Sequence, residues 1–416
     1  MWKLTKVAAV AAALAAAVAA HAGEVEVLHY WTSGGEAKSA AELKKMMQAK
    51  GHTWRDFAVA GGGGDSAMTV LKSRVISGNP PSAAQVKGPA IQEWASEGVL
   101  GNMDALAKSE KWDEALPKVV ADVMKYKGNY VAAPVNVHRV NWIWASSDAL
   151  KKAGVAAMPK TWDEFFAAAD KLKAAGLIPV AHGGQNWQDF TTFESVVLGV
   201  GGPKFYQDAL VKLDDKALTS DTMKKSLETF RRIKYYTDPG APGRDWNLAT
   251  AMLIQGKAGF QLMGDWAKGE FLAAGKAPGK DFLCAAAPGS ANAFTFNVDS
   301  FILFKLKDAA AQKAQSDLAS AIMSPGFQEV FNLNKGSIPV RAGQSMDKFD
   351  DCAKASAKDF ADTAKSGGLV PSVAHGMAIA PATEGAIKDA VSQFWNDDKV
   401  SVADAMKKIA TAAKTK

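Results

Sequence analysis

Residues 27–43, VLHYWTSGGEAKSAAEL, contain a complete strand–turn–helix unit. The strand-like half ends in two adjacent aromatic residues, Tyr30 and Trp31. Two glycines and Glu36 follow, and the Ala/Leu/Lys spacing after them is that of an amphipathic helix. A turn with two glycines is a poor position for a core side chain, which raises the question of what these rings and this carboxylate contact.

The same alternation continues along the chain. Strands are expected at residues 24–31 and 54–60, and helices at 36–49 and after the glycines at 61–64. A short strand, SAAQV, and a helix, GPAIQEWASEGVL, then repeat the order. Strands that alternate with helices of this length predict an α/β fold with parallel-rich sheets.

The length of the chain, 416 residues, predicts more than one domain. Two strand-rich stretches marked by proline and glycine, residues 128–146 and 287–304, interrupt the alternation. Pro134 lies inside the first of them, and a central strand tolerates proline poorly. We therefore interpret both stretches as crossings between two lobes, where they act as hinges.

The crossings divide the chain into two discontinuous lobes. Lobe 1 is expected to contain residues 23–133 and about 291–338, and lobe 2 residues 137–288 and about 341–416. Within lobe 2, TWDEFFAAADKLKAAG predicts a helix with a capping box formed by Thr161 and Glu164. Ligands of α/β proteins usually bind beside the carboxyl ends of parallel strands, so a site between the lobes is expected.

The N-terminus predicts export. Residues 1–22 contain two lysines, an Ala/Val/Leu run and Ala-His-Ala, which is the pattern of a signal peptide cut after Ala22. We therefore expect a periplasmic protein. The two cysteines, Cys284 and Cys352, can pair in an oxidising compartment, but the sequence leaves a disulfide and two buried thiols equally open.

Several functional classes are disfavoured. The formal net charge of +6 is small for this length, so a nucleic-acid partner is not supported. The glycines at 61–64 lead into Asp65-Ser66, whereas a nucleotide-binding loop needs Gly-Lys-Ser/Thr. The scattered histidines form no transition-metal motif, and the sequence has no G-x-S-x-G nucleophile elbow. We expect neither a metal nor another cofactor.

Aromatic and hydrogen-bonding side chains recur at expected loop positions near strand ends. These candidate site residues are Trp31, Glu36, Lys87, Trp246, Trp266, Asp299, Lys335 and His375. Two further residues at the first crossing, His138 and Arg139, are expected either in a hydrogen-bond network between the lobes or behind the site.

Over nearly its whole mature length the chain resembles the solute-binding proteins of carbohydrate importers driven by ATP-binding cassettes, in particular the glucose/aldose-binding branch. The resemblance rests on YWTSGGE, VNVHRVNWIW, TWDEFFAAADKLKAAG, GKAGFQLMGDW and NKGSIPVR. TWDEF and GDW indicate the broad class, whereas YWTSGGE together with VNVHR is more specific to the aldose branch. The resemblance implies a two-lobed periplasmic binding protein fold, of type II, that closes around a sugar.

A sugar ligand gives the candidate residues chemical roles. The C–H faces of a pyranose pack well on indole rings, so Trp31 is expected to hold the sugar together with Trp246 or Trp266 from the other lobe. Buried hydroxyls need partners, and charged partners bind them more strongly. The acceptors are Glu36 and Asp299, the donors are Lys87 and Lys335, and His375 can do either. Gly34 and Gly35 are expected to let the backbone approach the ligand.

These arguments predict a monomeric binding protein, not an enzyme, that captures an aldose, above all glucose, and delivers it to a membrane permease. Two alternatives remain: a periplasmic glycoside hydrolase and a sugar sensor that docks to a chemoreceptor. A hydrolase needs two carboxylates across the scissile bond, and Glu36 with Asp299 could be such a pair. Lysines beside both positions favour recognition of a whole sugar over cleavage.

Overall fold

The strand–turn–helix unit forms β1 (Glu24–His29) and α2 (Gly34–Ala49) in a computed structural model that describes residues 22–415. The predicted signal peptide, apart from its last residue, lies outside the described residues. Helix α2 begins at the double glycine, two residues earlier than expected, with Ser33 as its N-cap. Glu36 is in the first turn, where the helix dipole favours an anion.

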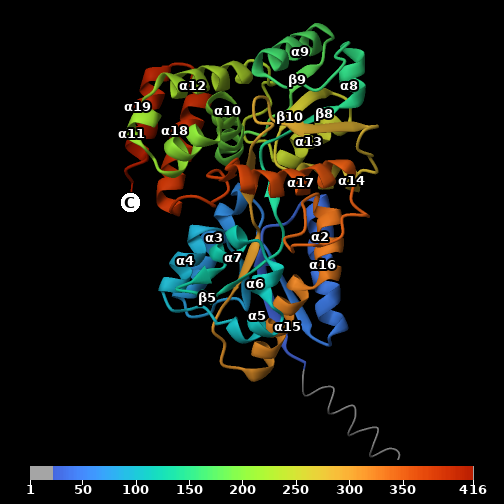
Figure 1. Cartoon of the computed structure of the whole chain (residues 1–416), viewed down its shortest axis with the longest axis vertical. Coiled ribbons are helices and arrows are strands. Elements are labelled where there is room, and N and C mark those ends of the chain that lie inside the picture. The colour runs from blue at the N-terminus through green and yellow to red at the C-terminus, as the bar shows by residue number, and fades with distance from the viewer. Residues whose placement is uncertain (1–21, 416) are drawn as a thin grey trace, which may run out of the picture.

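Lobe 1, the lower lobe in Figure 1, is built on a five-stranded sheet in the order β2-β1-β3-β13-β6. The strands added to β1 are β2 (Thr53–Ala58), β3 (Ala83–Gln85), β6 (Ala132–Pro134) and β13 (Ser300–Leu303). β1 pairs with β2 and β3 in parallel, whereas β13 is antiparallel to β3 and β6. Pro134 ends β6 at the edge of the sheet, where its missing N–H removes no internal hydrogen bond.

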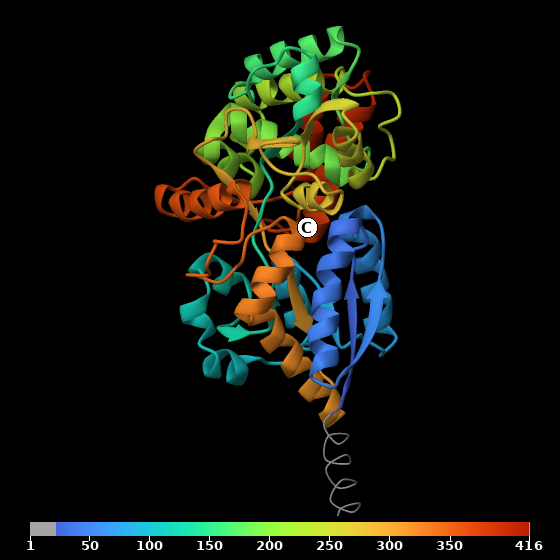
Figure 2. The ribbon, with the colours of Figure 1, turned by 90° about the vertical axis from the view of Figure 1, so that its right-hand side faces the viewer.

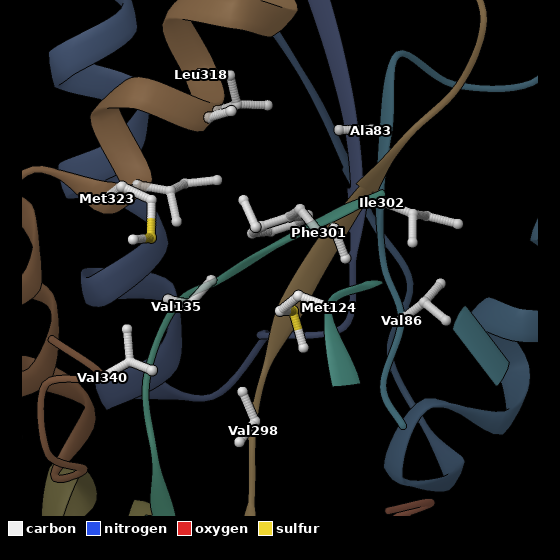
Figure 3. Close-up of a cluster of buried hydrophobic side chains, with 14 of the residues drawn as sticks. Ala83, Val86, Met124, Val135, Val298, Phe301, Ile302, Leu318, Met323 and Val340 are labelled. Carbon is white, nitrogen blue, oxygen red and sulfur yellow. The ribbon is translucent and has the colours of Figure 1, made fainter. Parts of the chain in front are cut away.

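The core of lobe 1 forms around β13. Phe301 and Ile302 are fully buried, and they lie among side chains from the flanking helices and strands in Figure 3. The surrounding elements are α3 (Asp65–Ile76), α4 (Pro89–Ser96), α5 (Asp104–Ser109), α6 (Trp112–Ala115), α7 (Lys118–Val123), β4 (Lys125–Tyr126), β5 (Asn129–Tyr130), α15 (Ala309–Met323) and α16 (Pro325–Lys335), with a 3-10 turn at Gly62–Gly64. Figure 2 shows α2 and α16 side by side on one face of this lobe.

Lobe 2 contains a four-stranded sheet in the order β11-β8-β10-β9. Its strands are β8 (Trp142–Ser146), β9 (Ile178–Val180), β10 (Ala258–Leu262) and β11 (Phe282–Ala286). β9 and β10 are parallel, but β8 is antiparallel to both of its neighbours, so this sheet is mixed and not parallel-rich. The antiparallel pairing arises because β8 enters lobe 2 directly from the crossing without a preceding helix.

The helices of lobe 2 cover both faces of this sheet. They are α8 (Ser147–Lys152), α9 (Trp162–Ala174), α10 (Asn186–Tyr206), α11 (Asp215–Leu218), α12 (Asp221–Lys234), α13 (Trp246–Ile254), α14 (Trp266–Ala273), α18 (Pro381–Asn396) and α19 (Val402–Ala412), with a π-helical turn at Gln207–Val211. The predicted capping box of Thr161 and Glu164 is present at the start of α9. None of the helices in residues 22–415 combines the length and hydrophobicity that a membrane crossing requires.

A third, small sheet joins the lobes. It consists of β7 (His138–Arg139), β12 (Phe294–Asn297) and β14 (Leu369–Pro371), in the order β14-β12-β7. β7 and β12 lie in the two predicted crossings, and β14 follows α17 (Asp351–Ser366), which packs beside this sheet. The two-lobed α/β fold class is thereby confirmed.

A disulfide ties two distant segments together. Cys284 on β11 is bonded to Cys352 on α17, 68 residues further along the chain. This settles the question that the sequence leaves open, and it fixes α17 against the sheet of lobe 2. Residues 22–415 contain no free cysteine.

Reduction of this disulfide should destabilise the protein. A closed loop of this size restricts the unfolded chain, and removal of such a bond typically costs about 2–4 kcal/mol. We expect the urea midpoint of the mature protein to fall in the presence of reductant, and Cys352→Ala to unfold at the same lowered midpoint with or without reductant. Titratable thiols in denatured, unreduced wild-type protein would contradict the bond.

Candidate functional site

A cavity of about 510 Å³ lies between the two lobes. All eight residues selected from the sequence line it: Trp31, Glu36, Lys87, Trp246, Trp266, Asp299, Lys335 and His375. Trp31, Glu36, Lys87 and Lys335 come from lobe 1, Asp299 follows β12, and the other three come from lobe 2. The structure therefore brings side chains that are more than 300 residues apart in sequence into one concave surface.

Aromatic rings form the lobe 2 wall of the cavity. Trp246 and Trp266 are the first residues of α13 and α14, so their rings project from helix starts at the cavity edge. Trp187, in the first turn of α10, lies with its ring centroid 6.5 Å from that of Trp266. The ring of His375 packs against both, at 4.8 Å from Trp266 and 5.7 Å from Trp187.

Trp31 is placed differently from these rings. It lines the cavity, but only 2% of its surface is exposed. Its ring packs against Phe301 and Phe331, with centroids 5.5 Å and 5.1 Å away. The two glycines after Trp31 led us to expect a ring outside the core. The ring is instead buried in an apolar pocket formed by Phe301 of β13 and Phe331 of α16.

Glu36 and Lys335 form an ion pair in lobe 1. The Lys335 ammonium donates to a Glu36 carboxylate oxygen at 2.5 Å, and the lysine side chain is only 3% exposed. Lys335 ends α16, where a cation is favoured by the helix dipole, and Glu36 begins α2. The positive charge of Lys335 thus balances the negative charge of Glu36, and both residues line the cavity.

His138 lies between two buried carboxylates. Its Nδ1 contacts Asp265 and its Nε2 lies 2.9 Å from Asp299. Burial alone would lower the pKa of His138, but the two carboxylates raise it above its usual range. Burial would likewise raise the pKa of Asp299, yet the charge and hydrogen bond of His138, with Lys87 and Lys335 nearby, hold it far below its usual range. These shifts favour an imidazolium at His138 beside an ionised Asp299.

Lys87 and His375 complete the polar lining from opposite lobes. The Lys87 ammonium lies 5.6 Å from the centroid of the Tyr30 ring, and burial lowers its pKa although Asp299 partly restores it. Burial and the charges of Lys87 and Lys388 keep the pKa of His375 well below its usual range. His375 is therefore neutral at pH 7, so its ring carries one donor and one acceptor.

Glycines at three places let the lobes approach each other around the cavity. A Cβ on Gly35 would lie 2.8 Å from the carbonyl carbon of Gly269 on α14, and one on Gly88 would lie 2.1 Å from the carbonyl oxygen of Gly376. A Cβ on Gly63 would lie 3.0 Å from the ring of Trp187. The expected role of Gly34 and Gly35 is corrected accordingly: Gly35 admits the opposite lobe, and the neighbour of Gly34 is the Glu270 carboxylate, 3.4 Å from a Cβ there.

Further residues line the cavity, and the sequence drew attention only to Tyr30 and His138 among them as possible site residues. The further residues are Tyr30, Thr32, Ser33, Ala60, Gly61, Gly63, Gly64, His138, Gln185, Trp187, Asp245, Asn247 and Asn297. Trp187 is the second residue of the long helix α10, a position at which a tryptophan usually packs into the core. Only its place in the segment after strand β9 could have indicated a role in the site. Asp245 and Asn247 flank Trp246, which was the available signal for them.

Comparison with known proteins places the chain in a family. The model for bacterial extracellular solute-binding proteins matches residues 31–321, and the chain belongs to this family. It is 48% identical to a probable sugar-binding periplasmic protein of Brucella suis, over 99% of each chain, and 49% identical to one of Rhizobium meliloti, over 96% of each.

A solved chitin oligosaccharide binding protein has the same fold, with a TM-score of 0.78 over 94% of this chain and 98% of that one, at 19% identity. The family is one of solute-binding proteins and not of enzymes. Within residues 22–415, no group of three or more His, Cys, Asp or Glu side chains is arranged to hold a metal ion.

The charge on His138 predicts a pH-dependent stability. Because the folded-state pKa is raised, the stability that the two carboxylates add is fully present below pH 6.5 and is lost as the pH rises through the folded-state pKa. In urea unfolding, we expect the stability difference between wild type and His138→Gln to shrink as the pH rises, by about 1.4 kcal/mol for each unit of pKa elevation. A difference that stays constant from acidic to alkaline pH would contradict a charged His138.

Proposed function

We propose that this protein is exported to the periplasm, where it captures a monosaccharide between its lobes and delivers it to the membrane subunits of an ATP-driven importer. The observation that carries the proposal is that indole rings and buried charged hydrogen-bonding groups from both lobes line one cavity. The names of the Brucella suis and Rhizobium meliloti relatives, and the aldose-type motifs YWTSGGE and VNVHR, support a sugar as the ligand.

The aromatic residues suit the faces of a sugar ring. Trp266 and Trp187 present indole surface from lobe 2, and Trp246 lies half-buried beside them. C–H groups of a pyranose gain dispersion and electrostatic attraction on such rings. Trp31 is proposed to contact the ligand from lobe 1, and its tight packing on Phe301 and Phe331 would hold it in a fixed position.

The polar residues suit the hydroxyls at the ring edge. Glu36 and Asp299 can accept from the ligand, Lys87 and Lys335 can donate, and the neutral ring of His375 offers one further nitrogen as an acceptor. The carboxylates are already paired with Lys335 and His138. A ligand therefore meets balanced charges, which favours a neutral molecule over an acid or an amine, and the hydrogen bonds gain strength from the charged partners.

The same geometry argues against glycoside hydrolysis. One carboxyl of a hydrolase must stay protonated to act as a general acid, which requires a raised pKa. Here His138, Lys87 and Lys335 hold the pKa of Asp299 far below its usual range despite burial, and Glu36 is paired with Lys335. Asp299 is therefore unsuited to act as the general acid.

Glucose is the proposed ligand. β-D-Glucopyranose has every hydroxyl equatorial, so both ring faces are apolar and can lie against tryptophan. Galactose has an axial 4-hydroxyl, which would meet an aromatic face and leave a buried charged partner unsatisfied, at a cost of about 1–3 kcal/mol.

Calorimetric titration of the mature protein with a panel of sugars tests this choice. We expect glucose to bind, with galactose weaker by about tenfold or more and maltose weaker still. Equal affinity for galactose or maltose would overturn the single-ring site. Absence of binding by every monosaccharide in the panel would overturn the proposed function itself.

Closure of the lobes around the sugar should depend on Gly35. Gly35→Ala places a methyl group against the backbone of Gly269, so the lobes cannot reach the same separation. We expect glucose affinity to fall about tenfold or more and the radius of gyration with glucose to stay above that of wild type. Gly385→Ala, on a helix with open space around its Cβ position, is the matched control. Wild-type affinity in both variants would show that this contact is not part of the bound state.

A further inference from the structure

A buried acid outside the cavity, Glu194, has no role in the site described so far. It lies on α10, in the interior of lobe 2, and is fully buried. Burial of a carboxylate is costly unless hydrogen bonds compensate for the lost water. Burial raises the pKa of Glu194 to about 7, while hydrogen bonds from Ser372, Ala374, Tyr206 and Val373 act in the opposite direction.

Nearly all of those hydrogen bonds come from one loop. The Ser372 hydroxyl donates to Glu194 Oε1 at 2.6 Å, and the backbone N–H groups of Val373 and Ala374 donate to Oε2 at 2.9 Å and 3.1 Å. Tyr206, at the end of the same helix, donates its hydroxyl to Oε2 at 2.8 Å. A single carboxylate thus fixes three consecutive residues of the segment between β14 and α18.

The next residue of this loop is His375, which lines the cavity. Its backbone N–H donates to the Ser372 hydroxyl at 3.2 Å, so the Glu194 network includes His375 itself. Its ring Nε2 lies 3.0 Å from the hydroxyl of Thr191, one turn before Glu194 on α10. Helix α10 therefore holds His375 at both its backbone and its side chain.

Thr191 also defines which ring nitrogen of His375 remains for a ligand. The Thr191 hydroxyl has one proton and lies 2.8 Å from the carbonyl oxygen of Trp187. With its proton on that carbonyl, Thr191 accepts from Nε2 of His375, and Nδ1 is left as the acceptor. Both the position and the tautomer of the ring then depend on contacts made within lobe 2, which persist when the lobes separate.

We infer that Glu194 is a positioning residue for ligand binding: its carboxylate holds the Ser372–Ala374 loop so that His375 presents its ring to the cavity. The inference rests on the proposed function in taking the ligand to be a sugar. The geometric part, that Glu194 fixes the ring of His375, does not depend on which ligand binds.

The test uses Glu194→Gln in the mature protein, because glutamine keeps the shape but its single carbonyl oxygen cannot accept from all four donors. We expect glucose affinity to fall about tenfold or more, since one of the two acceptor oxygens that hold the loop is replaced by a donor. The ring signals of His375, assigned in histidine-labelled protein with His375→Gln, should shift in the ligand-free state. Ser372→Ala should shift the same signals and weaken affinity by a smaller factor, and it provides a milder variant if Glu194→Gln does not fold.

Asp189→Asn is the matched control. Asp189 is also a fully buried acid on α10, but it contacts His182 and Ser392, not the loop. We expect it to leave the His375 signals and glucose affinity at wild-type values. Unchanged affinity in Glu194→Gln, unchanged His375 signals in that variant, or equal losses in Asp189→Asn would each overturn the inference. If wild type binds no monosaccharide, the proposed function fails, and the His375 signals alone decide whether Glu194 positions the ring.

Discussion

The hydrogen-bonded contact of one imidazole with two carboxylates holds the centre of the molecule together. His138 lies on the first crossing, Asp299 on the turn after β12, and Asp265 directly before the first residue of α14 in lobe 2. Asp265 also accepts from the backbone N–H of Arg139, so α14 is fixed to the crossing strand by two separate bonds. A buried imidazole between two carboxylates is tolerable because hydrogen bonds and opposite charge compensate for the lost water. The position of Trp266, directly after Asp265, follows from this arrangement, and with it the aromatic wall of the cavity.

The second constraint is steric. The N-terminus of α2 and the C-terminus of α16 meet α14 of the other lobe at Gly35, Gly269 and Gly336, where any Cβ would fall within 3 Å of backbone atoms. Backbone contact of this kind brings the cavity walls close enough for both to touch a small ligand. Gly35 N–H also donates to the Glu270 carboxylate at 2.8 Å, which adds a polar contact between the lobes.

Much of this arrangement was predictable from local sequence, and the limits have physical reasons. The strand–helix alternation and the capping box of Thr161 are encoded within a few residues, so the fold class followed directly. Trp31, Lys87, Trp266, Asp299 and His375 follow strand ends within a few residues, whereas Glu36, Trp246 and Lys335 lie on α2, α13 and α16. All eight line the cavity. The burial of Trp31 against Phe331, the partner of Gly35 and the role of Glu194 each depend on contacts between segments about 180 or more residues apart. No local pattern records such contacts, and the mixed pairing in the sheets of both lobes was missed for the same reason.

The place of β13 in lobe 1 has a consequence for how the protein folds. This strand lies between β3 and β6, yet it follows them in sequence by the whole length of lobe 2's sheet. Until β13 pairs with its neighbours, β6 has no partner in the sheet of lobe 1, and Phe301 and Ile302 are absent from the core of this lobe. Contacts across such a long loop have a large closure entropy and slow the search for the native state. A chain of this topology remains incompletely folded during most of its synthesis, which keeps it extended for longer than a protein whose first domain can fold alone.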